Sequence, residues 1–419
     1  MLLATAIIFV FLAIFNRIKT TPIYPGFVFC ASWAVSLLIL IATNDLFYRL
    51  APQTLVVFIC GGLVVTLACA LGSISSSKPP SPVDRQASNR ILTAMLWLVV
   101  LATPVFLVWL WQAVAAAGGN APLLGAARML QVNAIESGDD NAFRAAFYLI
   151  LFSQSVAVLC LWEKKGHERR ATVAIVFALI LSIPFGQKAG PFSLVIALIC
   201  VDWIRNRRMR WKLITVTFLA MLCLTAIVEF YVHLGGSSDT NSVARMIGLY
   251  VSGGIIGFDQ VVRDPSIVTH INPVDILGLR IARRLGNNVV IPEVYGYANI
   301  GPYGLRTNVY TIFWPLMNWG WLANMCTIGF IFFSVTRVYK RALQGGMPWV
   351  QLYAAMLFGV VFSTFTEYFI PSLYLYLVLV TTNWIVYSLP VRITQFRGFN
   401  RNIVHNQLRS QEPPPMEVL

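Results

Sequence analysis

The sequence has little charge. Only 11% of its 419 residues are Asp, Glu, Lys or Arg, and the acidic residues number 17. Apolar residues make up 58% of the chain, and the mean hydropathy is +0.71. These values exceed those of ordinary soluble domains, so the composition excludes a soluble globular protein and indicates a membrane protein.

Motifs that many enzymes use to hold metals or nucleotides are also missing. The four histidines are scattered without an HExxH pattern, and no GxxxxGK[ST] stretch occurs. All seven cysteines lie in apolar segments, so we expect neither a disulfide framework nor a CxxC metal site. We therefore expect no metal and no cofactor.

Long apolar runs fill most of the chain. At about 20 apolar residues per membrane-spanning helix, they predict an all-α polytopic membrane protein with about eleven transmembrane helices and one large external loop. We expect a single membrane domain over 1–390 and a cytoplasmic, disordered tail over 391–419. The expected spans are 2–15, 26–43, 53–71, 91–113, 143–162, 171–186, 190–204, 213–232, 313–336, 349–367 and 373–389.

The lysines and arginines predict the orientation. Most of the 31 basic residues fall on one set of alternate connectors and in the carboxyl tail. Basic connectors stay on the cytoplasmic side, which places the long loop 233–308 outside. The net charge of +14 is then mainly a topology signal beside anionic lipid, so we expect no nucleic-acid partner.

The loop 233–308 holds the main candidates for substrate binding. We expect a helix over 243–262, broken at Gly253–Gly254, and an amphipathic helix over 275–285. Guanidinium groups suit bidentate contact with phosphate oxygens, and a lipid-linked pyrophosphate is one ligand of that kind. An amphipathic helix lying on anionic lipid is the other interpretation. The arginines concerned are Arg245, Arg280, Arg283, Arg284 and Arg306.

Lys188 lies between two apolar segments on the side where basic residues are scarce. A cation placed there binds an anionic substrate or reaches towards lipid phosphate, and the sequence leaves both roles open.

Three residues are candidates for a proton acceptor. Asp259 is a carboxylate in an apolar stretch, suited to act as a general base or to pair with Arg263 four residues later. His270 is a lone histidine, for which a surface or hydrogen-bonding role is the commoner outcome. Glu367 lies at the outer end of an expected span, and ionisable groups there are functional or paired.

Two short motifs resemble a known family. The stretch Arg245-Met-Ile-Gly-Leu-Tyr250-Val-Ser-Gly-Gly-Ile-Ile-Gly-Phe258-Asp259 is similar to one in bacterial oligosaccharide repeat unit polymerases, where an Arg precedes a Tyr-rich helix ending in Phe-Asp. Asn308-Val-Tyr310-Thr311 resembles their Asn-x-Tyr-Thr signature after a large outer loop. These are the Wzy-type polymerases of O-antigen and capsule synthesis. The resemblance spans about 140 to 389.

One departure concerns an acidic residue. The family often has an Asp-Phe-Gly-like segment after the Asn-x-Tyr-Thr stretch, whereas this chain has Asn318-Trp319-Gly320. A role for that acid is therefore not carried over.

The resemblance implies a metal-independent glycosyltransferase of the bacterial inner membrane, acting on its periplasmic or exterior face. A growing glycan would move from undecaprenyl pyrophosphate onto the next lipid-linked repeat unit. The architecture would resemble that of multi-span lipid-linked-sugar glycosyltransferases, with Asn308 and Tyr310 beside the substrate. The implied partners are the lipid-linked oligosaccharide, membrane lipid, a chain-length regulator and a flippase.

Two alternatives remain at this stage. An O-antigen ligase would use the same donor with a lipid A core acceptor, and an essential His270 would favour it. A lipid-linked oligosaccharide flippase or other transporter would be expected to show ionisable residues at mid-membrane and inverted repeats. The expected spans hold almost no such residues, which favours the polymerase.

Overall fold

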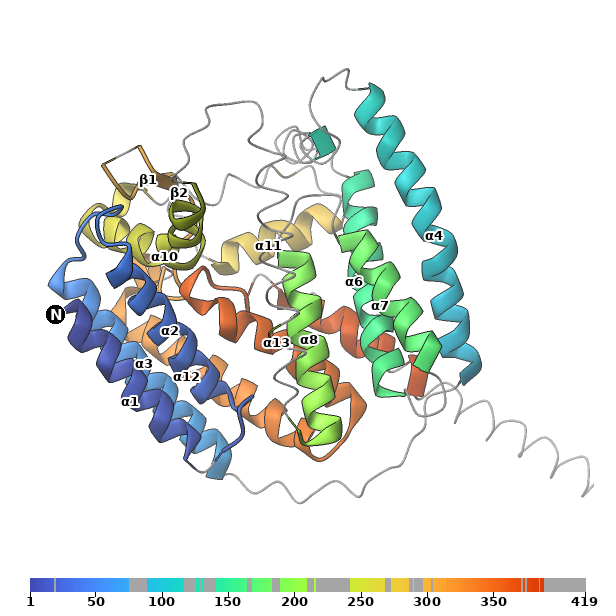
Figure 1. Ribbon diagram of the computed structural model, residues 1–419, viewed down its shortest axis with the longest axis horizontal. Helices are drawn as coiled ribbons and strands as arrows, with labels where there is room; N and C mark the ends of the chain where they lie inside the picture. The colour runs from blue at the N-terminus through green and yellow to red at the C-terminus, as the bar shows by residue number, and fades with distance from the viewer. Residues whose placement is uncertain are drawn as a thin grey trace, which may run out of the picture.

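A computed structural model gives the fold of the chain (Figure 1). The residues that it describes are 1–18, 20–74, 89–116, 126–127, 130, 141–163, 168–182, 189–208, 215, 242–267, 273–285, 289, 297–302, 304–314, 316–370, 372–373, 375–383 and 385–387. The expected span 213–232 and the tail 391–419 lie almost wholly outside these residues.

Within the described residues the protein is an all-α membrane protein. Six helices are long and apolar enough to cross a membrane. They are α2, α3 and α4 in full, most of α6 and α12, and α13 together with the 3-10 turn η2 (Phe362–Thr364) that follows it. The count of eleven spans stays a prediction. The helices of the bundle are α1 (Leu2–Arg17), α2 (Pro25–Ala42), α3 (Pro52–Ile74), α4 (Asn89–Ala116), α6 (Asn141–Trp162), α7 (Glu168–Ser182), α8 (Ala189–Asn206), α12 (Leu316–Leu343), α13 (Met347–Val361) and a last helix, Leu375–Tyr387.

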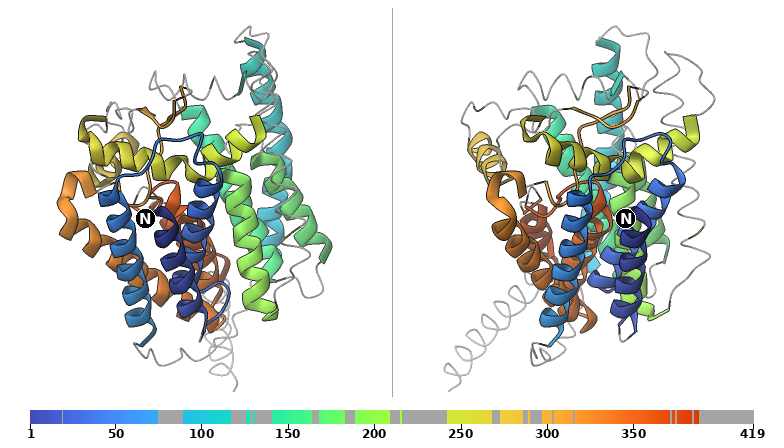
Figure 2. Two further views of the ribbon diagram at one scale, coloured as in Figure 1. Left: turned by 60° about the vertical axis from the view of Figure 1, so that its left-hand side comes forward. Right: turned by 90° about the vertical axis from the view of Figure 1, so that its left-hand side faces the viewer.

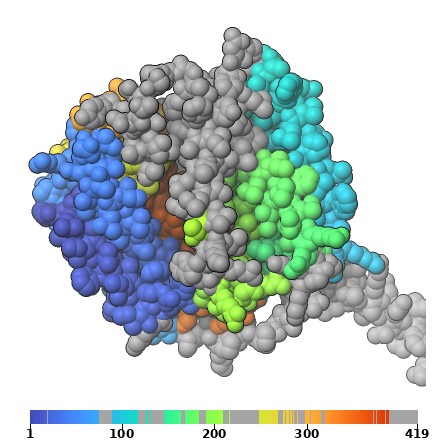
Figure 3. All heavy atoms as spheres, in the orientation of Figure 1, coloured from blue at the N-terminus to red at the C-terminus, as the bar shows by residue number. Residues whose placement is uncertain are grey.

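The helices form two groups joined by α13. α1, α2, α3 and α12 pack together, α4, α6 and α7 form the second group, and α13 contacts α2, α6, α8 and α12. The space-filling view shows the α1–α3 group and the α6–α8 group on opposite sides of one face (Figure 3). Large apolar side chains of α1, α3 and α4 are exposed, as expected for surfaces that lipid covers.

Helix α10 (Ser242–Arg263) lies across one end of the bundle, roughly perpendicular to the spanning helices (Figure 2). An added Cβ at Gly254 would lie 2.5 Å from the carbonyl oxygen of Thr364, and one at Gly257 would lie 2.6 Å from that of Val309. The glycines therefore let α10 pack directly against backbone. The predicted break at Gly253–Gly254 is wrong, because α10 continues through both residues.

Two irregular segments, 309–314 and 362–370, meet beneath α10. The Ile312 amide donates to the carbonyl oxygen of Ser363 over 2.8 Å. Backbone outside regular helices is tolerated at membrane depth when protein covers it. The expected span 313–336 begins three residues before α12, which starts at Leu316 with a kink at Gly320 (φ 76°), and stops seven residues short of its end at Leu343. The expected span 349–367 runs six residues past α13, which ends at Val361.

The expected loop 233–308 contains further short elements at the α10 end. These are η1 (Pro265–Ile267), α11 (Pro273–Arg284), β1 (Ala298–Asn299) and β2 (Arg306–Thr307), with β1 and β2 antiparallel. The Tyr48 amide donates to the Ile300 carbonyl over 3.0 Å, so the loop between α2 and α3 lies beside this hairpin.

The other end of the bundle carries most of the described basic residues. It gathers the carboxyl ends of α1, α3, α6, α8 and α12, where hydrogen bonds join basic side chains to neighbouring helices. We call it the basic end, and the opposite one the α10 end.

Candidate functional site

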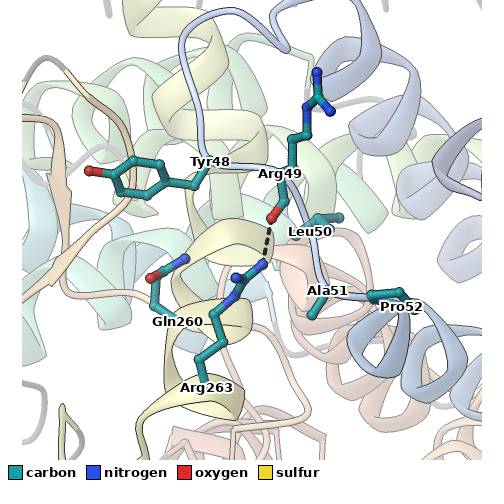
Figure 4. A pocket seen from close by; sticks show the side chains of 7 residues that line it. All are labelled: Tyr48, Arg49, Leu50, Ala51, Pro52, Gln260 and Arg263. Atoms are coloured by element: carbon teal, nitrogen blue, oxygen red, sulfur yellow. Dashed lines mark hydrogen bonds between the residues drawn. The ribbon is translucent and has the colours of Figure 1, made fainter.

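An open pocket lies at the α10 end, between the loop that precedes α3 and the last turn of α10. Its volume is about 530 Å³, within the range of small-molecule sites. The lining residues are Tyr48, Arg49, Leu50, Ala51, Pro52, Gln260 and Arg263 (Figure 4). The lining includes two arginines and no acidic residue.

Asp259 lies fully buried behind this pocket. Its Oδ1 accepts hydrogen bonds from the Ala51 amide at 2.8 Å and the Thr54 hydroxyl at 2.6 Å. Its Oδ2 accepts one from Arg263 Nε at 2.8 Å. The alternative of an ion pair with Arg263 is therefore confirmed. Because both oxygens are engaged and the side chain is 0% exposed, Asp259 positions α3 and Arg263 in this conformation.

The sequence of α3 explains why a carboxylate is held there. α3 begins at Pro52, and the first amides of a helix lack partners within it. The partial positive charge of this helix end favours a nearby anion, which Asp259 supplies from another helix. The Asp259 carboxylate, which joins α10 to α3, also holds the Nε atom of Arg263 in place.

Arg263 and Arg49 are the two cationic residues of the pocket lining, and the buried Asp259 carboxylate offsets the charge of Arg263. Arg263 also donates to the Arg49 carbonyl oxygen over 2.6 Å, and its side chain remains 47% exposed. The Arg49 side chain is exposed and extends away from Arg263 (Figure 4). Since no described side chain binds the Arg49 guanidinium, it is available to a ligand at the rim.

Arg306 lies on the hairpin beside this loop. Its side chain is exposed, and its Nε donates to Asn299 Oδ1 over 3.1 Å. Asn308, two residues later, is also exposed. Both predicted substrate-binding residues thus face outward at the α10 end.

Tyr310 differs from its predicted role beside the substrate. It is 0% exposed and packs beneath α10, where its ring atom Cδ1 would lie 3.2 Å from a Cβ added at Gly257. In this conformation Tyr310 contributes packing, and a substrate contact would need α10 to move.

Two arginines of the expected loop lie far apart along one helix. Arg245 and Arg263 lie on α10, separated by 18 residues, which corresponds to about 27 Å at 1.5 Å per residue. One pyrophosphate group is much shorter than that distance. Arg280, Arg283 and Arg284 lie on α11, whose backbone alone is described at these positions.

Glu367 lies in the irregular segment after α13, with 3% of its side chain exposed. Oε1 accepts from the Phe369 amide at 2.6 Å and the Ile370 amide at 3.0 Å. Burial raises the pKa of the carboxyl to about 7, against the lowering effect of the Ile370 and Phe369 amides. A carboxyl of this kind titrates near neutral pH.

Two predicted site residues, His270 and Lys188, lie outside the described residues, so their roles stay predictions. Among the residues that the structure does describe, no group of three or more His, Cys, Asp or Glu could hold a metal ion.

The sequence interpretation did not single out Arg49. It lies in one of the short connectors in which basic residues are scarce, the same signal that drew attention to Lys188. The contact between this connector and the last turn of α10, more than 200 positions away, had no counterpart in the sequence pattern.

Comparisons of the chain with protein-family models, with curated proteins and with solved structures find no match.

Proposed function

We propose that the protein is a polymerase of lipid-linked oligosaccharide repeat units. It would transfer a growing glycan from undecaprenyl pyrophosphate to the next lipid-linked repeat, for O-antigen, capsule or exopolysaccharide synthesis. The observation that carries the proposal is the pocket at the α10 end, lined by Arg49 and Arg263 and remote from the basic end of the bundle.

The pocket suits the pyrophosphate of the donor. Two nitrogens of Arg263 donate hydrogen bonds, one to Asp259 and one to the Arg49 carbonyl oxygen, yet about half of the side chain remains exposed beside the pocket. Fixed cations stabilise the charge that develops on a departing pyrophosphate. Arg49 at the rim and Arg306 on the neighbouring hairpin would hold the rest of the headgroup. These guanidinium groups would stabilise the charge on the departing pyrophosphate without a metal ion.

The proton acceptor is proposed to be one of the predicted candidates. Asp259 and Glu367 would have different roles. Asp259 would act through Arg263, as a positioning residue. Glu367, whose pKa is about 7, matches the basicity expected of a general base near neutral pH. Its amide contacts would have to open before it reached an acceptor hydroxyl, and His270 remains the other candidate.

The membrane context is proposed with the function. The basic end would face the cytoplasm of a bacterial inner membrane, so that the pocket opens to the periplasm or exterior. There the donor's undecaprenyl chain would lie in the bilayer beside the spanning helices. A flippase would supply the lipid-linked repeat units, and a chain-length regulator would act on the product.

The test is polymer formation by the purified protein in lipid nanodiscs supplied with lipid-linked repeat units. We expect a ladder of products from the natural chain and about a tenfold lower kcat/KM for Arg49→Ala, the size expected for loss of one charged hydrogen bond. Arg306→Lys should also lose most polymer, because lysine keeps the charge and loses the bidentate geometry.

Arg208→Ala is the matched control, because Arg208 is an exposed arginine at the basic end. Normal ladders from both Arg49→Ala and Arg306→Lys would remove the pocket from the proposal. Absence of any product from the natural chain, with folded protein and a bound donor, would remove the polymerase itself.

A second candidate is a transporter of lipid-linked oligosaccharide, and one observation favours it. The two irregular segments beneath α10 are hydrogen-bonded to each other, with the buried carboxyl of Glu367 on one of them. Interrupted helices of this kind form substrate sites in transporters. Movement of the donor across sealed vesicles without polymer formation would select this alternative.

A further inference from the structure

Helix α11 carries an apolar stripe that faces outward. Val274 is 54% exposed, Ile281 48% and Leu285 78%. Leu285 continues the helical turn, because its amide donates to the Ile281 carbonyl over 3.1 Å. At about 100° per residue, these three positions and Gly278 fall within about 60° of one another. They form one stripe, which we call the α11 stripe.

The space beside the α11 stripe is open. An added Cβ at Gly278 would meet no atom of the described residues within 4 Å, so none of them packs against the middle of the stripe. Elsewhere in the described part of the chain, exposed aliphatic side chains lie mainly on α1, α3, α4, α7 and the last helix. On those helices lipid is the expected neighbour, which points to lipid for α11 also.

The position and charge of α11 agree with a lipid surface. α11 lies at the α10 end, where the spanning helices begin and end (Figures 1 and 2). Trp321, near the start of α12, is 50% exposed, as is usual for aromatic residues at a membrane–water boundary. The three arginines Arg280, Arg283 and Arg284 occupy helix positions about 90–170° from the stripe.

We propose that α11 lies in the plane of the membrane boundary, with the α11 stripe in the hydrocarbon edge and its arginines among the phosphate groups of anionic lipid. Helices of this kind combine an apolar face with a basic one. The occupant of the surface is the bilayer itself. This assignment is independent of the proposed polymerase activity, because it concerns lipids that are always present.

The experiment measures the depth of spin labels in nanodiscs. Nitroxides are attached at Ile281→Cys and Leu285→Cys, with Asp275→Cys about 100° around the helix as the matched control. The background chain has its seven native cysteines replaced. We expect the ratio of oxygen accessibility to nickel-complex accessibility to be severalfold higher at 281 and 285 than at 275.

A higher nickel accessibility at 281 and 285 would place the stripe in water and overturn the proposal. Low accessibility to both reagents would also overturn it, because protein would then cover the stripe. No substrate is added, so the result does not depend on activity.

The lipid composition tests the arginines separately. In phosphatidylcholine mixed with phosphatidylglycerol, the labels should lie deeper than in phosphatidylcholine alone. Replacing Arg280, Arg283 and Arg284 with Gln should remove that difference. Equal depth in both lipids, unaffected by these substitutions, would overturn the contact between α11 and lipid phosphate.

Discussion

The two ends of the bundle use arginine differently. At the basic end, cationic side chains bind carbonyl oxygens in the last turns of helices, which lack partners within the helix. The bonds run from Arg205 to Leu161 in α6 at 2.6 Å, from Arg207 to Leu343 in α12 at 2.6 Å, and from Lys340 to Ser73 in α3. These cations complete helix ends and are therefore structural.

At the α10 end, the helix terminus that needs a hydrogen-bond partner is the amino terminus of α3. An anion, Asp259, supplies that partner for α3, and Arg263 balances it. The other exposed arginines there, Arg49 and Arg306, are not used to complete a helix. The comparison teaches that the cations to test for ligand binding are those left over after helix ends are satisfied.

The largest expected effect follows removal of the anion. Asp259→Ala leaves the Ala51 amide and Thr54 hydroxyl without their acceptor and frees Arg263. We expect a loss of about 2–3 kcal/mol of stability, at the lower end of the cost for a broken buried pair because Arg263 is half exposed. The measurement is the fraction of protein that stays monodisperse after heating, read beside polymer formation.

Asp264→Ala is the control, because Asp264 is an exposed acid on the adjacent turn. Asp259→Asn and Arg263→Ala, singly and together, separate the two roles of Asp259. If it only pairs, the double variant is no worse than the worse single variant. A stable Asp259→Asn protein that binds donor but makes no polymer would instead identify Asp259 as the proton acceptor.

The sequence was sufficient for the helical class and for the positions of most helices. Apolar runs such as those of α2 and α3 predict their helices to within a few residues, because membrane spans need long apolar stretches. Patterns failed at the outer ends of α12 and α13. There, buried irregular backbone is as apolar as a helix, so hydropathy does not distinguish the two.

The site could be predicted only in part. The neighbours Asp259 and Arg263 are four residues apart on one helix, a spacing that indicates an ion pair directly. Arg49 and Thr54 join them through tertiary packing of α3 on α10, which a single sequence does not encode as a local pattern. Gly254 was interpreted as a helix break because its packing partner, the backbone at Thr364, was not known.

The second prediction concerns Glu367, a buried acid at the α10 end that no described cation balances. Its pKa is raised from 4.5 to about 7. The folded protein therefore holds the proton more tightly than the unfolded chain does. The contribution to stability is complete below about pH 4.5 and is lost as pH rises through about 7.

The groups facing Glu367 are the Phe369 and Ile370 amides and Tyr376. Glu367→Gln should abolish this part of the pH dependence, measured as heat resistance across the same window. An unchanged pH profile in Glu367→Gln would show that another group causes it. A flattened stability profile with normal polymer formation would remove Glu367 from the list of proton acceptors.

The smallest expected effect belongs to the basic end. Arg207 follows α8 with a φ of 54°, and its guanidinium reaches the last carbonyl of α12. Arg207→Ala keeps the same backbone requirement. It removes the side-chain hydrogen bond and the contact of the guanidinium with the Trp203 ring, 5.5 Å from its centroid, so we expect a loss of about 1 kcal/mol in stability. Polymer formation, corrected for folded protein, should not change.

Arg208→Ala, the exposed neighbour, should alter neither quantity. If Arg207→Ala lowered the affinity for the lipid-linked donor without affecting heat resistance, the division between structural cations at the basic end and ligand-binding cations at the α10 end would be wrong.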